Sequence, residues 1–178
     1  MKLLRTIRLD PSDTFVFEHA AEPGEWAVSG AFMFWECDPA TIAGKTRAAF
    51  RSGFLGVTSL GWSTLVQIVD ASEDDRSAVV DLLAQNFVDR LGAPSLDQAR
   101  AAAEQEVAFA ASLCEHPRDT LIAVHRAVAD GAIREAFRTL RPRGERKPMR
   151  AFNFVEVEGE EEPGETVNLA SLGQSERK

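Results

Sequence analysis

TLIAVHRAVADGAIREAFRTL, residues 120–140, is the stretch whose interpretation decides the fold of this chain. Asp130-Gly131 at its centre is a preferred two-residue turn between antiparallel strands. If the flanking residues pair across that turn, Arg126 lies opposite Glu135, which places opposite charges side by side. The pattern therefore predicts a β-hairpin.

A pair of helices is the alternative for this stretch. Ile133, Phe137 and Leu140 recur at three- and four-residue spacing, which is also typical of the buried side of a helix. The Asp-Gly pair would interrupt such a helix, so we favour the hairpin and leave the helical interpretation open.

Two long amphipathic helices are predicted before this stretch. Ser72 can cap a helix that runs to about residue 91, and Ser95 can cap a second one that ends before Pro117. Apolar residues recur at helical spacing in both, so each has one side to bury.

The first third of the chain has the composition of β-strands. Residues 26–35 are apolar at nearly every position, which predicts a central strand covered on both faces. Further expected elements are strands over residues 3–9, 14–17, 64–69 and 151–157, a helix from Asp38-Pro39 to Phe50, and a loop over residues 54–63.

These elements together predict a single α+β domain over residues 1–157. We expect a largely antiparallel sheet with the two long amphipathic helices packed on one face. Residues 158–178 are polar and acidic, and we expect them to form a flexible tail.

Composition excludes several classes of protein. The chain has 178 residues, of which 44% are hydrophobic and 27% charged, as in ordinary globular proteins. Cys37 and Cys114 stand too far apart in sequence, and alone, to suggest a disulfide framework. Neither a signal-peptide core nor a membrane-spanning run is visible, so we expect a cytoplasmic protein without membrane association.

Charge is distributed unevenly along the chain. The net charge of -8 argues against nucleic-acid partners. Residues 118–150, however, hold nine Lys and Arg against four Asp and Glu, a local charge of +5. Residues 151–178 hold seven acidic against two basic residues, a local charge of -5.

The basic segment is the predicted binding site. In the hairpin, Arg134, Arg138 and His125 share one face, and Arg126 lies in the same segment. Arginine is suited to bidentate contact with carboxylate and phosphate groups. The sequence therefore predicts a non-enzymatic binding or accessory protein, able to form a homodimer, that binds an anionic small molecule or an acidic protein partner here.

A small enzyme is the alternative hypothesis. Its site would lie between the loop of residues 53–63 and the sheet, where Lys45, Ser63 and His125 could meet. Trp62 and Phe54 are expected to be partly exposed there, at a pocket mouth or a dimer contact.

Other motifs do not predict a catalytic, cofactor or metal site. Gly44-Lys45-Thr46 matches the end of a phosphate-binding loop, but Pro39 stands where its first glycine is required. Cys114 and His116 are of residue types that bind zinc, but their spacing does not match a structural zinc motif. Glu106 is expected on the outer side of its helix. No catalytic residue, cofactor or metal is predicted.

Three segments carry a resemblance to a known family: residues 1–10, 26–30 and 133–142 (IREAFRTLRP). With these segments the chain resembles a small uncharacterised family of bacterial proteins, mainly from proteobacteria. The resemblance implies similarity over most of the chain. That family has no assigned activity, so the resemblance implies no catalytic residues.

Overall fold

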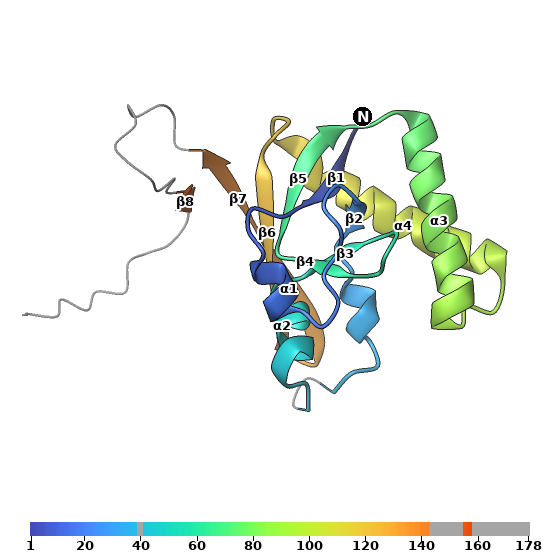
Figure 1. The fold of residues 1–178 in the computed structure, drawn as a ribbon. Helices are drawn as coiled ribbons and strands as arrows, with labels where there is room; N and C mark the ends of the chain where they lie inside the picture. Colours follow the sequence, from blue (N-terminus) through green and yellow to red (C-terminus); the bar gives the residue numbers. More distant parts are fainter. Residues whose placement is uncertain (39–40, 143–154, 158–178) are drawn as a thin grey trace, which may run out of the picture.

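The computed structural model describes residues 1–38, 41–142 and 155–157, which form one sheet with helices packed against it (Figure 1). The strands are β1 (Lys2–Ile7), β2 (Trp26–Val28), β3 (Phe54–Gly56), β4 (Trp62–Ser63), β5 (Leu65–Asp70), β6 (Leu121–Ala129), β7 (Ala132–Pro142) and β8 (Val155–Val157). The helices are α1 (Ser12–Val16), α2 (Gly44–Ser52), α3 (Glu73–Leu91) and α4 (Leu96–Ser112), with 3-10 helices η1 (Ala31–Phe34) and η2 (Leu113–Glu115).

The sheet confirms the predicted α+β class. Its strand order is β4-β3-β2-β1-β5-β6-β7-β8, and each neighbouring pair of these described strands is antiparallel. The centre is formed by β1 and β5, which pair over their whole length from Lys2↔Asp70 to Ile7↔Leu65. The central position that we expected for residues 26–35 is therefore taken by β1 and β5.

The two long helices begin and end where their capping residues predict. The Ser72 hydroxyl accepts a hydrogen bond from the Asp75 amide, and the Asp75 carboxylate accepts one in return from the Ser72 amide. Gly92, with φ of 71°, ends α3 in the left-handed conformation that favours glycine. Figure 1 shows α4 running behind the sheet, with α3 beside it. Small buried residues such as Ala103 allow α4 to pack closely.

The β6–β7 hairpin is confirmed in the predicted register. Asp130 and Gly131 form the turn with φ of 54° and 74°, and Arg126 pairs with Glu135. Both turn residues therefore adopt the left-handed conformations that a two-residue hairpin turn requires.

The predicted long strand over residues 26–35 was wrong beyond Val28. Gly30, with φ of 79°, turns the chain into η1. The apolar residues that follow pack as a helical turn: Phe32 contacts Phe87 edge to face, and Phe34 stacks on Trp62. The apolar run predicted packing of Phe32 and Phe34 but not the backbone conformation, and Trp35 at its end is exposed.

Three further expectations are corrected or narrowed. The strand expected over residues 14–17 is replaced by helix α1, which ends at Val16. The buried Asp13 of this helix accepts hydrogen bonds from the amide and hydroxyl of Thr64. Residues 54–63, expected to be a loop, contain β3 and β4. Such short strands are stabilised by their neighbours more than by their own sequence, so the sequence pattern did not reveal them. The helix expected from residue 38 begins only at Gly44. The predicted acidic tail, residues 158–178, lies outside the described residues.

Candidate functional site

The β6–β7 hairpin presents two different faces. Directly opposite residues of an antiparallel pair project to the same side of a sheet. Glu135 therefore projects with Arg126, and Phe137, two residues further on, projects to the same side. There Phe137 contacts Phe109 of α4 with ring centroids 5.8 Å apart. Arg126 thus lies on the helix-covered face.

The opposite face of the hairpin carries the other three predicted site residues. His125, Arg134 and Arg138 are all exposed, and His125 lies diagonally between the two arginines, which pair with Ala127 and Ala123. We call these three residues the basic hairpin face. Their predicted position on one face is confirmed, whereas their role in binding stays a prediction.

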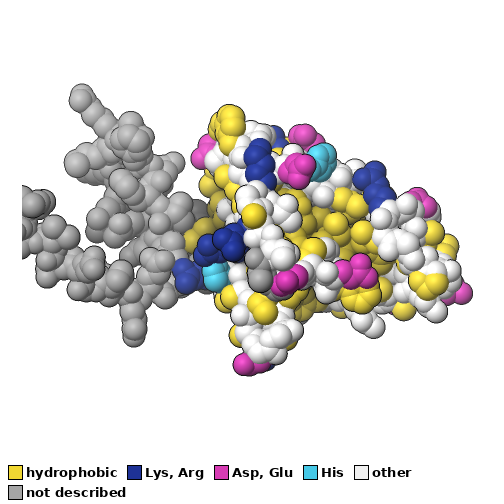
Figure 2. All heavy atoms as spheres, turned by 90° about the horizontal axis from the view of Figure 1, so that it is seen from below, with side chains coloured by type: hydrophobic (Ala, Val, Ile, Leu, Met, Phe, Trp, Pro, Cys, Tyr) yellow, Lys and Arg dark blue, Asp and Glu magenta, His cyan; other side chains and the backbone are white. Residues whose placement is uncertain are grey.

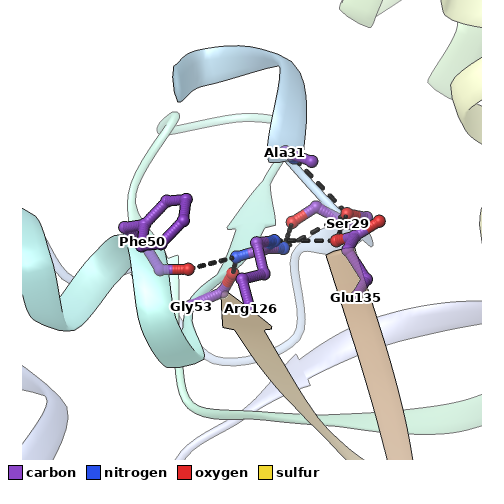
Figure 3. A network of polar contacts seen from close by, with 6 residues as sticks. All are labelled: Ser29, Ala31, Phe50, Gly53, Arg126 and Glu135. Atoms are coloured by element: carbon purple, nitrogen blue, oxygen red, sulfur yellow. Dashed lines mark hydrogen bonds and ion pairs between the residues drawn. The ribbon is translucent and has the colours of Figure 1, made fainter. Parts of the chain in front are cut away.

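Arg126 is a buried structural residue, with only 1% of its surface exposed. A guanidinium group has five N–H donors, and the structure gives five hydrogen bonds. Its Nε donates to Glu135 at 2.7 Å, Nη1 donates to the carbonyls of Phe50 and Gly53, and Nη2 donates to the carbonyl and hydroxyl of Ser29 (Figure 3). Our expectation that Arg126 contacts a ligand is corrected, because no donor remains for one.

The position of Arg126 also explains how α2 is held. The carbonyls of Phe50 and Gly53 belong to the C-terminal end of α2, where the helix dipole is negative. Burial lowers the pKa of Arg126, and the neighbouring Glu135 opposes that effect. One guanidinium therefore connects α2, β7 and the turn before η1.

A shallow depression lies between α2 and β6, with a volume of about 340 Å³. Arg47 and Arg51, one helical turn apart on α2, contribute its exposed cationic groups, and the exposed His125 on β6 lines it beside them. We call this depression the basic groove. The remaining lining residues are Ile42, Phe50, Arg126, Ala127 and Val128.

The cationic groups of the groove are not neutralised by their neighbours. Among the described residues, Arg47, Arg51 and His125 form no hydrogen bond or ion pair through their side chains. Figure 2 shows basic side chains gathered beside a histidine on this side of the molecule. Because His125 belongs to both the groove and the hairpin face, the two features form one continuous basic surface.

The backbone of β6 explains why the groove exists. Strand β5 pairs with β6 only from Leu121 to Ala123. The rest of β6, including His125, extends past β5, and α2 packs against it there. The depression is the space between this extension and the helix.

Glu106 and Glu135 form a carboxylate pair beside Arg126 that the sequence pattern did not predict. We expected Glu106 on the outer side of α4, but it is half-buried and electrostatically coupled to Glu135 and Arg126. Burial, with a further contribution from Glu135, raises the pKa of Glu106 to about 7. The position of Glu106 in α4, adjacent to the buried Val107, was the sequence feature that could have indicated its partial burial.

The residues of the alternative enzyme site are not brought together. Ser63 is buried, and its hydroxyl donates to the carbonyls of Ile7 and Leu65. Lys45 donates to the carbonyl of Phe17 at 3.4 Å, whereas His125 lies in the basic groove. The segment we expected to be a loop forms β3 and β4, and Ser63 in β4 is buried, whereas His125 is exposed.

Of the two aromatic residues expected to be partly exposed, one is. Trp62 is partly exposed and stacks on Phe34, whereas Phe54 is fully buried, which corrects the expectation for that residue. The highly exposed aromatic residues are Phe15 and Trp35, with 73% and 80% of their surfaces accessible. The expected homodimer stays a prediction.

Two absences characterise the described part of the chain. None of its helices combines the length and apolar composition needed to cross a bilayer. In the same residues, no group of three or more His, Cys, Asp or Glu side chains is placed to hold a metal ion.

These features define the class: a single α+β domain whose antiparallel sheet carries a basic groove beside its last long hairpin. The chain belongs to a family of unknown function, DUF6505, whose model matches residues 1–155. No curated protein and no solved structure matches the chain. Membership confirms the resemblance to a family without assigned activity.

Proposed function

We propose that this protein binds a small anionic ligand in the basic groove. The observation that carries the proposal is the convergence of Arg47, Arg51 and His125 on one depression without an acidic partner among the described residues. Unpaired cations that share a concave site favour binding of a carboxylate or phosphate group.

The walls of the groove indicate the rest of the ligand. Ile42, Phe50 and Val128 add apolar surface beside the cationic groups. A volume of about 340 Å³ is at the small end of the range of ligand sites. We therefore infer a compact ligand with one anionic group and an apolar body.

The basic hairpin face supports a second candidate function, binding of an acidic protein partner. His125, Arg134 and Arg138 lie along two paired strands and are all exposed. An extended acidic segment could contact all three, because alternate residues of a strand project to the same side.

We also infer a reducing, cytoplasmic compartment. Cys37 and Cys114 are both free thiols, one exposed and one buried. Free cysteines persist where thiols are kept reduced. Location of a tagged copy in cell fractions would test this inference.

Thermal-shift and NMR titrations with phenyl phosphate test the proposed function, with benzyl alcohol as the neutral analogue. We expect phenyl phosphate to raise the melting temperature and to shift the signals of Arg47, Arg51 and His125 saturably. In the double variant Arg47→Gln/Arg51→Gln we expect at least a tenfold loss of affinity, because both cationic groups are removed.

The matched control is Arg90→Gln, which removes an exposed arginine at the end of α3. This variant should bind phenyl phosphate as the native chain does. Equal affinity of all three proteins, or equal effects of phenyl phosphate and benzyl alcohol, would contradict the proposal.

A further inference from the structure

The chain itself contains an acidic segment of the kind that the basic hairpin face would bind. Residues 158–165, EGEEEPGE, hold five glutamates and no basic residue. The opposing face carries His125, Arg134 and Arg138 on two adjacent strands. Charges of opposite sign are therefore concentrated in two parts of one chain.

Strand β8 points along β7 in the direction of Arg138 and Arg134. Strand β7 runs away from the hairpin turn, and β8 pairs antiparallel with its far end through Leu140↔Val157 and Pro142↔Val155 (Figure 1). The chain therefore leaves β8 at Val157 heading back toward the turn, and Arg138 and Arg134 lie in that direction along β7.

The acidic segment is also long enough to reach the face. Six residues of β7 separate Leu140 from Arg134, about 20 Å at the rise of a strand. Residues 158–165 can extend over about 26 Å. The contour length of the segment is thus sufficient to span the distance from Val157 to both arginines.

We propose that residues 158–165 dock on the basic hairpin face of their own chain and compete with anionic ligands for the basic surface. This inference rests on the proposed function and adds a regulation to it. A tethered segment acts at an effective concentration in the millimolar range for short flexible linkers. An external anion must therefore bind more tightly than the tethered glutamates in order to displace them. The site is then selective for anions of higher affinity than glutamate side chains.

His125 provides the connection between docking and ligand binding. It lies in the hairpin face between Arg134 and Arg138, and it also lines the groove with Arg47 and Arg51. Negative charge placed over the hairpin face would therefore repel an anion that enters the groove. The Debye length at physiological salt is about 8 Å, so this repulsion acts between groups close to His125 and weakens as salt is added.

Paramagnetic relaxation tests the docking without any ligand. A nitroxide is attached to Thr166→Cys in a Cys37→Ser background, in which Cys114 remains buried. We expect it to broaden the amide signals of His125, Arg134 and Arg138. Broadening should disappear in 1 M NaCl and in a full-length variant with Glu→Gln at residues 158, 160, 161, 162 and 165. The matched control carries Glu→Asp at the same five positions, keeps the charge, and should retain the broadening.

Three outcomes would overturn the docking: no broadening in the native segment, equal broadening in the Gln variant, or broadening that arises only when labelled chains act on separate isotope-enriched chains. The last result would assign the contact to a second copy. None of these measurements depends on the proposed ligand.

Titration with phenyl phosphate then tests the competition. We expect the Gln variant to bind phenyl phosphate at least threefold more tightly than the Asp variant. Equal affinities would overturn the competition. If neither variant binds phenyl phosphate saturably, the proposed function fails, and the relaxation experiment still decides whether the segment docks.

Discussion

Arg126 and Glu135 face each other across the β6–β7 hairpin, and Nε of Arg126 donates to Oε1 of Glu135 at 2.7 Å. The same Glu135 oxygen accepts a hydrogen bond from the Ser29 hydroxyl, which also accepts one from the Ala31 amide (Figure 3). A buried ion pair contributes to stability only when its remaining donors and acceptors are satisfied. The complete set of partners around Arg126 meets that condition, so the pair holds three distant segments together.

Removal of this guanidinium should destabilise the protein strongly. We expect Arg126→Met to lower the free energy of unfolding by about 3–5 kcal/mol, because it leaves Glu135 without its cation and several carbonyls without donors. Arg134→Met, on the exposed face of the same hairpin, should change it by less than about 0.5 kcal/mol. Urea denaturation measures both. Equal losses of unfolding free energy in the two variants would contradict the prediction that the buried ion pair stabilises the fold more than an exposed arginine does.

Stability should fall as the pH rises through neutrality, in part because of Glu106. Its pKa is about 7 in the folded chain against an ordinary value of 4.5. The folded state therefore keeps a proton that the unfolded chain releases, so this contribution is fully present below about pH 4.5 and is lost as the pH passes 7.

The variant Glu106→Gln isolates this effect. We expect it to be more stable than the native chain at pH 8, by about 1–3 kcal/mol after allowance for partial exposure, and similar to it at pH 5. Glu104→Gln, an exposed neighbour on α4, should show no such pH-dependent difference. Parallel urea curves at the two pH values provide the measurement, and a constant difference between native and Glu106→Gln proteins would refute the prediction.

The turn at Gly30 should not accept a larger residue. A Cβ atom there would lie 2.6 Å from Cβ of Leu55 and 3.0 Å from the ring of Trp62, and φ is 79°. Gly30→Ala should therefore destabilise the chain by about 2–5 kcal/mol, through backbone strain and overpacking together.

Gly24→Ala is the matched control for this prediction. Gly24 has φ of 86° but no atom within 4 Å of an added Cβ, so only the backbone strain of about 1–2 kcal/mol applies. Thermal unfolding of both variants separates the two causes. A Gly24→Ala loss as large as that of Gly30→Ala would mean that packing against Leu55 and Trp62 is unimportant.

One of the two thiols should react much faster than the other. Cys37 is exposed, whereas Cys114 is buried and burial raises its pKa to about 11. Because the thiolate is the reactive form, a disulfide reagent should modify one thiol per native chain rapidly. Cys37→Ser should abolish that rapid phase. If the rapid phase instead persists in Cys37→Ser and disappears in Cys114→Ser, the prediction that Cys37 is the reactive thiol is wrong.

Elements with strong local signals were predicted well. The α3 helix has its capping Ser72 and its terminal Gly92, and the hairpin has Asp130-Gly131 at its turn. In each case the decisive chemistry lies within a few residues of the element. The apolar segment of residues 26–35 has no such local signal beyond Gly30, and its conformation was decided by the aromatic side chains that η1 packs against.

The candidate site was predicted in part. The alternation of the hairpin placed His125, Arg134 and Arg138 together, and the same alternation could have placed Arg126 on the opposite face with the buried Val124. Arg47 was not connected to this surface. It precedes His125 by 78 positions in the sequence, and no local pattern relates the two.

The sequence by itself determined the hairpin, the two capped helices and the separation of basic from acidic segments, because turns, caps and alternation depend on neighbouring residues. Only the tertiary structure decided which arginine is buried as a structural residue and which are exposed. The burial of Arg126 depends on carbonyls from α2 and from Ser29, and the groove at His125 depends on α2 packing beside β6. Desolvation of a charge is set by what surrounds it in space, and those surroundings come from segments far apart in the chain.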